Sequence, residues 1–233
     1  MKQRRNIKRH YSNKNVWLFV VTSAVVLVVI YIIVILLKYV LPASQSLSDQ
    51  ASVEVAKTEN VSIVSDLLDP NEYSRPQTPL KEVRGVVIHY TANPGTDAKA
   101  NRDYFNGLPE SNQGRTRPLY VSSHYVIGLD GTIIQCVPLD EVAYASNDRN
   151  NDTISIECCH PEGNGKFTDE TYDSLVRLVA WLCGEYNISS DGIIRHYDVT
   201  GKNCPKYFVE HEKKWKRFKK DVFSYIDEHP VSS

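Results

Sequence analysis

The first 38 residues contain no acidic side chain, although seven of the chain's 27 lysine and arginine residues lie there. The rest of the chain therefore holds 20 basic residues against all 28 acidic ones, a net charge of −8. Binding to nucleic acid requires clustered lysine and arginine for the phosphates, and an acidic domain lacks that excess. The composition thus argues against a nucleic-acid partner.

Charge is also absent from residues 16–37, where only Thr22 and Ser23 interrupt an apolar run. About 20 apolar residues are needed to cross a hydrocarbon core of roughly 30 Å. A buried core helix would keep a polar face, and a signal peptide has a core of about 7–15 residues followed by a small-residue cleavage site. We therefore expect a retained transmembrane anchor over residues 16–38. The positive-inside rule predicts a cytoplasmic basic tail at residues 1–15 and an extracytoplasmic remainder at the cell membrane.

Residues 39–80 read as an extracytoplasmic linker rich in serine, proline and acidic residues. As a flexible coil, such a segment would span roughly 35 Å. Its short apolar stretch at residues 61–68 is also compatible with a strand or helix packed on the following domain. The sequence leaves these two readings open.

A globular domain is expected over residues 81–229, with no internal repeat. Apolar runs rich in β-branched residues predict strands at residues 83–90, 153–159 and 192–196, and a hairpin at residues 121–137 turning at Asp130-Gly131. Helical spacing of apolar residues predicts helices at residues 97–106, 168–186 and 209–227, with Thr96 or Asp97 and then Thr168 as N-caps. Because strands and helices alternate, we expect an α/β fold with a central mixed β-sheet flanked by helices.

Two histidines and a cysteine stand out at the ends of predicted elements. His89 and His196 each end a predicted strand, and Cys204 follows His196 by eight residues across the predicted loop 197–203. Two imidazoles and a thiolate suit Zn²⁺, and three protein ligands leave a fourth position for water, as in catalytic zinc sites. Taken singly, each of these residues is as compatible with a structural position.

The sequence motifs around His89, His196 and Cys204 resemble those of a known family. IHYTA at 88–92, HY at 124–125 followed by DGT at 130–132 and IQ at 134–135, and RHYDVTGKNCP at 195–205 occur in this order. Together they resemble the zinc-dependent N-acetylmuramoyl-L-alanine amidases, a family that includes phage lysozyme-type amidases and peptidoglycan recognition proteins. The resemblance runs from about residue 83 to residue 225. It implies hydrolysis of the amide bond between N-acetylmuramic acid and L-alanine in peptidoglycan.

The resemblance also implies roles for single residues. His89, His196 and Cys204 match zinc ligands, and Lys202 matches a lysine beside the metal that could stabilise the oxyanion. Strand alternation places Glu157 opposite the Ile154, Ile156 and Cys158 face, so that its carboxylate should meet a polar cleft. Its counterpart in the bacterial branch is the general base. The structural alternatives are a solvated loop lysine and a carboxylate paired at the rim of the sheet.

Two positions depart from the family pattern. Ser123 stands where some phage-type relatives have a catalytic tyrosine, which shifts more of the proton transfer to Glu157. Tyr144-Ala145-Ser146 stands where related sequences often read aromatic-His-Ala, so that substrate positioning is expected to differ. His124 is compatible both with lining the cleft and with packing beneath it.

The remaining cysteines, Cys136, Cys158, Cys159 and Cys183, are expected to be buried thiols, although disulfides are possible outside the cell. Alternation points Cys158 and Cys159 to opposite faces. Two other functions fit the same residues: a non-catalytic muropeptide-binding module of the same fold, and a cysteine hydrolase. The first commonly lacks the cysteine ligand, and the context of Cys204 does not resemble a nucleophile motif.

Overall fold

The structure is a computed structural model that describes residues 28–29, 31–32, 58 and 61–230. The expected anchor at 16–38, except for residues 28–29 and 31–32, thus falls outside the described residues, as does half of the expected linker, residues 39–57 and 59–60. No helix among the described residues is long and apolar enough to cross a membrane. Residues 61–230 belong to one compact unit, which spans Glu54–Ser233.

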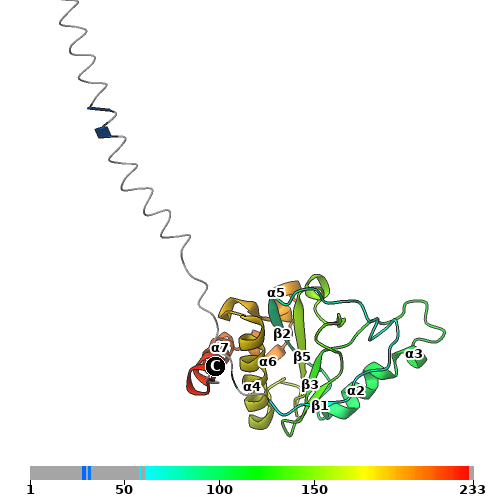
Figure 1. The fold of residues 1–233 in the computed structure, drawn as a ribbon. Coiled ribbons are helices and arrows are strands. Elements are labelled where there is room, and N and C mark those ends of the chain that lie inside the picture. The colour runs from blue at the N-terminus through cyan, green and yellow to red at the C-terminus, as the bar shows by residue number, and fades with distance from the viewer. Residues whose placement is uncertain (1–27, 30, 33–57, 59–60, 231–233) are drawn as a thin grey trace, which may run out of the picture. The chain divides into compact units, whose positions relative to one another are not determined.

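A six-stranded sheet in the order β1-β4-β3-β5-β2-β6 forms the centre of this unit (Figure 1). Its neighbouring strands are parallel except for the antiparallel hairpin of β3 and β4. The expected mixed sheet is therefore confirmed. The strands are β1 (Val64–Ser65), β2 (Gly85–Tyr90), β3 (Tyr125–Ile127), β4 (Ile133–Gln135), β5 (Thr153–Cys158) and β6 (Ile193–Arg195).

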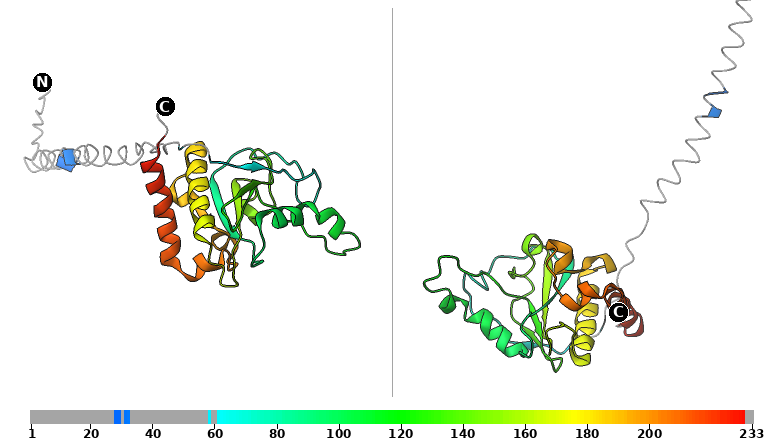
Figure 2. Two further views of the ribbon diagram at one scale, coloured as in Figure 1. Left: turned by 90° about the horizontal axis from the view of Figure 1, so that it is seen from below. Right: turned by 180° about the vertical axis from the view of Figure 1, so that it is seen from behind.

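Helices cover both faces of the sheet, as the views in Figure 2 show. α2 lies against one face, while α4 and α7 pack together on the other. The helices are α2 (Ala98–Asn106), α3 (Leu108–Ser111), α4 (Asp169–Tyr186), α5 (His196–Thr200), α6 (Lys206–Glu210) and α7 (Glu212–Glu228), with 3-10 turns η1 (Asn147–Arg149) and η2 (Ser190–Gly192).

Strand alternation divides the core into two apolar layers. Ile154 and Ile156 face the layer that contains α4 and α7. Val126 and Ile134 face the smaller layer under α2, together with Phe105. Period-two alternation therefore buries both faces of the central strands.

Side-chain caps fix where the two long predicted helices begin. The Asp97 carboxylate accepts a 2.7 Å hydrogen bond from the Ala100 amide, and the Thr168 hydroxyl accepts one of 3.0 Å from Thr171. Each cap is worth about 1 kcal/mol. Both helices start where the sequence predicts.

The C-terminal helix differs from the expectation of one helix over 209–227. The chain forms α6 and then α7, separated at His211, whose ψ of 70° is not helical. After this break the Trp215 and Phe218 rings pack on the Phe208 ring, with centroids 5.5 and 5.4 Å from it. The short first helix thereby joins the apolar layer of α7.

Residues 61–80 are part of the folded unit. β1 pairs with β4, and Leu68 is only 1% exposed. The Arg75 guanidinium binds both carboxylate oxygens of Glu141 at 2.8 Å. Of the two readings left open for residues 61–68, the packed strand is the one found, and the folded domain extends at least twenty residues before residue 81.

Candidate metal centre and active site

The candidate site lies where three neighbouring strands end. In the parallel pair β2 and β5, His89 lies directly beside Glu157. On the other side of β2, β6 ends at Arg195, so that His196 is the first residue of α5 rather than the last of the strand. A hydrogen bond of 2.8 Å from the Tyr197 amide to the Cys204 carbonyl folds the following loop back over this edge.

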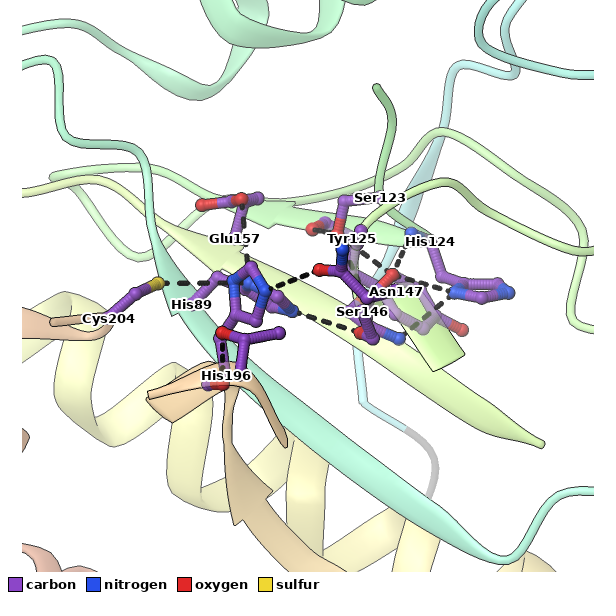
Figure 3. A network of polar contacts seen from close by, with 12 residues as sticks. His89, Ser123, His124, Tyr125, Ser146, Asn147, Glu157, His196 and Cys204 are labelled. Atoms are coloured by element: carbon purple, nitrogen blue, oxygen red, sulfur yellow. Dashed lines mark hydrogen bonds and ion pairs between the residues drawn. The ribbon is translucent and has the colours of Figure 1, made fainter. Parts of the chain in front are cut away.

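His89, His196 and Cys204 converge, as predicted. Their donor atoms all lie within 4.8 Å of one another, and the three residues are buried. The Cys204 Sγ is 3.8 Å from the His89 Nδ1 (Figure 3). Bond lengths of 2.0–2.3 Å in tetrahedral geometry separate zinc donors by about 3.5 Å. The spacing of this cluster is close to what one zinc ion requires.

The hydrogen bonds of the two imidazoles use Nε2 of each ring and leave Nδ1 for a cation. The His196 Nε2 is 2.9 Å from the Asn147 Oδ1, whereas its Nδ1 is buried and has no hydrogen-bond partner. The His89 Nε2 is 3.2 Å from the Ser146 Oγ, and its Nδ1 faces Cys204 and Glu157. A buried nitrogen without a partner is costly unless something binds it. The donor set therefore fits a zinc ion.

Burial favours the forms of these ligands that a cation can bind. Burial lowers the pKa of His89 well below its usual value, and the nearby His196 and Lys202 lower it further. Burial, with a smaller effect of Lys202, also lowers the pKa of His196. Both imidazoles are then neutral at pH 7, as metal ligation requires.

For Cys204, burial favours the form that cannot bind a cation. Burial raises the pKa of its thiol to about 12, and the Glu157 carboxylate acts in the same direction. A thiol with this pKa is protonated at pH 7 and is a poor nucleophile. Only a bound cation would turn it into a thiolate, which argues for a ligand and against a cysteine hydrolase.

Glu157 lies on the polar side of β5, as alternation predicts. Its Oε1 is 3.9 Å from the His89 Nδ1, and its Oε2 is buried without a hydrogen-bond partner. Burial raises the pKa of this carboxyl to about 8, while the charge of Lys202 opposes the shift. A carboxyl with a pKa near neutrality, next to a cation site, has the properties of a general acid–base.

A cleft of about 370 Å³ opens over the cluster. Lys202 lines it and is itself exposed, so that it is placed beside the donors as the resemblance implies. Ala145 also lines it. A larger hollow of about 680 Å³ around Leu67 and Tyr186 contains none of these donors. The donor residues that line the smaller cleft, rather than its volume, therefore identify it as the candidate site.

His124 and Ser123 do not reach the cleft. His124 is 1% exposed; its Nδ1 lies 3.0 Å from the Ser155 Oγ and its Nε2 lies 3.0 Å from the Glu141 carbonyl. The Ser123 hydroxyl donates to the carbonyls of Tyr125 and Ser155. Of the two readings of His124, packing beneath the cleft is the one found. Ser123 likewise is buried just before β3, and its hydroxyl is bonded to β3 and β5 rather than to the candidate site.

Ser146 and Asn147, which hydrogen-bond the two imidazoles, were missed by the sequence reasoning. Nothing in their spacing marks them, and the departure at residues 144–146 is the one signal that pointed to this loop. The four cysteines outside the site are buried and free of disulfides, as expected, and Cys204 is buried and free as well. Cys158 packs in the α4 layer and Cys159 in the α2 layer, on opposite faces of the sheet.

Fold and site together define an α/β domain with a two-histidine, one-cysteine cation site at the edge of its sheet. Comparison with known proteins identifies the class. Residues 79–207 match the family described as N-acetylmuramoyl-L-alanine amidase. The chain belongs to this family.

The relatives and solved structures agree with this assignment. N-acetylmuramoyl-L-alanine amidase CwlL of Bacillus licheniformis is 36% identical over 74% of this chain and 49% of its own length. The amidase BlyA of Bacillus subtilis (strain 168) is 32% identical over 70% of this chain and 47% of its own. The chain thus spans about half the length of these curated relatives.

The structure of PlyL (26% identity, TM-score 0.57) covers 70% of this chain and 97% of PlyL. The catalytic domain of XlyA (27%, TM-score 0.55) covers 70% of this chain and 99% of that domain.

Proposed function

We propose that this chain hydrolyses the amide bond between N-acetylmuramic acid and L-alanine in peptidoglycan, with one Zn²⁺ bound by His89, His196 and Cys204. The convergence of three buried donors within 4.8 Å carries the proposal. The unpartnered His196 Nδ1 and the Glu157 carboxyl, 3.9 Å from the His89 Nδ1, support it. Family membership and the amidase names of the relatives indicate which bond is hydrolysed.

A zinc ion held here would polarise the amide carbonyl and lower the pKa of a water molecule. Glu157 takes the proton from the attacking water as that oxygen adds to the carbonyl carbon. The same carboxyl then delivers the proton to the nitrogen when the C–N bond breaks, which releases the muramic carboxylate and the amine of L-alanine. Its raised pKa suits both steps, because a group near neutrality accepts and donates at similar cost.

Lys202 is proposed to stabilise the negative charge that develops on the carbonyl oxygen. It lines the cleft, and its charge lowers the pKa values of His89 and His196 and opposes the raised pKa of Glu157. A cation close to developing charge acts more strongly in a cleft than in open water.

A non-catalytic module that only holds muropeptide is the alternative. The presence of Cys204 and of a Glu157 carboxyl with an unpartnered oxygen favours catalysis, because a receptor needs neither. A buried carboxyl oxygen without a hydrogen-bond partner costs free energy, and catalysis would explain that cost.

Digestion of purified peptidoglycan, with and without a chelator, tests the proposal. We expect new free L-alanine amino groups without new reducing sugars, lost on chelation and restored by Zn²⁺. Muropeptide binding without any new ends, in a chain loaded with zinc, would make the module a receptor and would contradict the roles given to Glu157 and Lys202. Activity that resists chelation but not alkylation would instead indicate a cysteine hydrolase.

We also propose that residues 16–38 anchor the chain in the cell membrane, with residues 1–15 in the cytoplasm and the folded domain outside. The support is the uncharged run of residues 16–37 and the seven basic residues at its ends. Extraction of membranes with alkaline carbonate should leave the chain in the pellet, and external protease should remove the domain from spheroplasts. Release by carbonate would contradict the anchor without affecting the proposed chemistry.

A further inference from the structure

We propose that a single loop, residues 145–150, positions both imidazoles for the cation, with Ser146 orienting His89 and Asn147 orienting His196. The inference rests on the proposed zinc site and adds two positioning residues to it. These two residues are consecutive, whereas the histidines that they contact are 107 positions apart, from His89 to His196.

The contact of Asn147 determines which nitrogen of His196 is free. The Asn147 Oδ1 is a pure acceptor, so that the His196 Nε2 at 2.9 Å must carry the hydrogen. A neutral imidazole then has its lone pair on Nδ1, the atom that is buried without a partner and that we assign as the His196 donor of the cluster. Partners of this kind fix the tautomer and the ring orientation of metal-binding histidines.

Ser146 makes the corresponding contact with His89. Its hydroxyl is 3.2 Å from the His89 Nε2, and the residue is only 1% exposed. With the Nε2–H donating to the hydroxyl oxygen, the lone pair of His89 lies on Nδ1, which is 3.8 Å from the Cys204 sulfur. The two rings lie with their centroids 4.7 Å apart, so that a rotation of one would disturb the other. Figure 3 shows both partners on the same side of the ring pair.

The loop is itself held in place. The Asn150 side-chain oxygen accepts hydrogen bonds from the amides of Ala145 and Ser146. The Asn150 amide donates to the Asn147 carbonyl at 3.0 Å. Asn147 has a φ of 51°, a left-handed conformation that costs most residues about 1 kcal/mol and that asparagine tolerates. These bonds keep Asn147 in a conformation that directs its side chain at His196.

Alanine at position 146 would have no polar atom to offer the His89 ring. A Ser146→Ala variant therefore removes one hydroxyl and introduces no foreign shape.

The test measures zinc affinity of the full chain in detergent by competition with a chromophoric chelator. Ser146→Ala and Asn147→Gly should each weaken zinc binding by about 10–100-fold. Asn147→Asp should restore the affinity, because a carboxylate oxygen accepts the same N–H. The absorption bands of the Co²⁺-substituted chain should change in Asn147→Gly and return in Asn147→Asp.

Asn187→Gly is the matched control. Asn187 is also left-handed, with a φ of 53°, and it caps α4 away from the cleft, so that the same substitution there should leave the zinc affinity unchanged. Zinc affinity equal to that of the unmodified chain in both Ser146→Ala and Asn147→Gly would overturn the inference alone. Failure of the unmodified chain to bind zinc would overturn the proposed function and the inference with it. If Asn147→Gly does not fold, Ser146→Ala and the Asn147→Asp spectrum decide.

Discussion

Two buried histidine environments lie on the same sheet and differ in one respect. Beneath the cleft, His124 has a partner for each ring nitrogen: Ser155 for Nδ1 and the Glu141 carbonyl for Nε2. At the edge of the sheet, His196 has a partner for Nε2 only, and its Nδ1 is left over. Burial lowers the pKa of both rings, so that the pKa does not distinguish them.

The difference lies in the unused lone pair. A histidine with both nitrogens satisfied has reached the end of its hydrogen-bonding capacity and contributes to stability. A histidine with a buried unused nitrogen costs free energy in folding, and function is the usual reason that such a cost persists. Substitutions at the two places should therefore separate activity from stability.

His196→Ala should have the largest effect. Loss of one donor should remove zinc and lower the turnover of peptidoglycan by about ten-thousand-fold, because several kcal/mol of charge stabilisation disappear. The free energy of unfolding, measured without zinc, should fall less than in His124→Ala, because only the hydrogen bond to the Asn147 Oδ1 is lost and the Nδ1 had no partner. Metal content by mass spectrometry and release of L-alanine amino groups measure the two quantities. His211→Ala, an exposed histidine at the start of α7, is the control. Full zinc content in His196→Ala would mean that His196, like His124, is not a metal ligand.

Glu157→Gln should lower activity by about a thousand-fold and leave zinc in place. The amide keeps the shape of the side chain but can neither take nor return a proton. Zinc content and rate measured on the same preparation separate this effect from metal loss, and Glu162→Gln, an exposed glutamate, provides a matched control. Undiminished activity with zinc bound would mean that the general base lies elsewhere.

His124→Ala should show the reverse pattern. Two buried groups, Ser155 and the Glu141 carbonyl, would each lose a partner, so that the free energy of unfolding should fall by about 3 kcal/mol. Zinc stoichiometry of the folded protein should not change. Urea unfolding of a chain that begins at Glu54, where the compact unit starts, measures the loss. Loss of zinc at unchanged stability would place His124 in the site after all.

Much of the site could be predicted from sequence because its parts follow the ends of strands. His89 and Glu157 come from β2 and β5, and strand alternation alone placed Glu157 on the polar side. Parallel strands bring such ends to one edge of the sheet. The convergence of Cys204 depended on the resemblance, since no periodicity describes the loop that carries it.

Other features depend on contacts that no local pattern encodes. In α2 the apolar Tyr104 is 51% exposed, whereas the charged Arg102 is only 9% exposed and binds the carbonyls of Asp66 and Leu67. A segment distant in sequence thus decides which side of the helix is covered. For the same reason the partners of the imidazoles, Ser146 and Asn147, could not be found from spacing.

The smallest expected effect is a pH dependence of stability that belongs to His124. Burial lowers its pKa from 6.5 to about 4, against a smaller opposing effect of the hydrogen bond to the Glu141 carbonyl and of the Glu141 charge. The unfolded chain therefore binds a proton near pH 6.5 that the folded chain refuses until about pH 4, so that stability is present above pH 6.5 and falls as the pH drops through this window. Between pH 7 and pH 5 this contribution should amount to about 2 kcal/mol.

His89 and His196 also have lowered pKa values and add to the pH dependence of stability. For this reason the comparison is made between the unmodified chain and His124→Ala. Urea unfolding at the two pH values should show the gap between these proteins narrowing by about 2 kcal/mol at pH 5. A gap that stays constant would mean that folded His124 titrates like an exposed histidine, and the contrast between the two buried environments would then extend to their protonation.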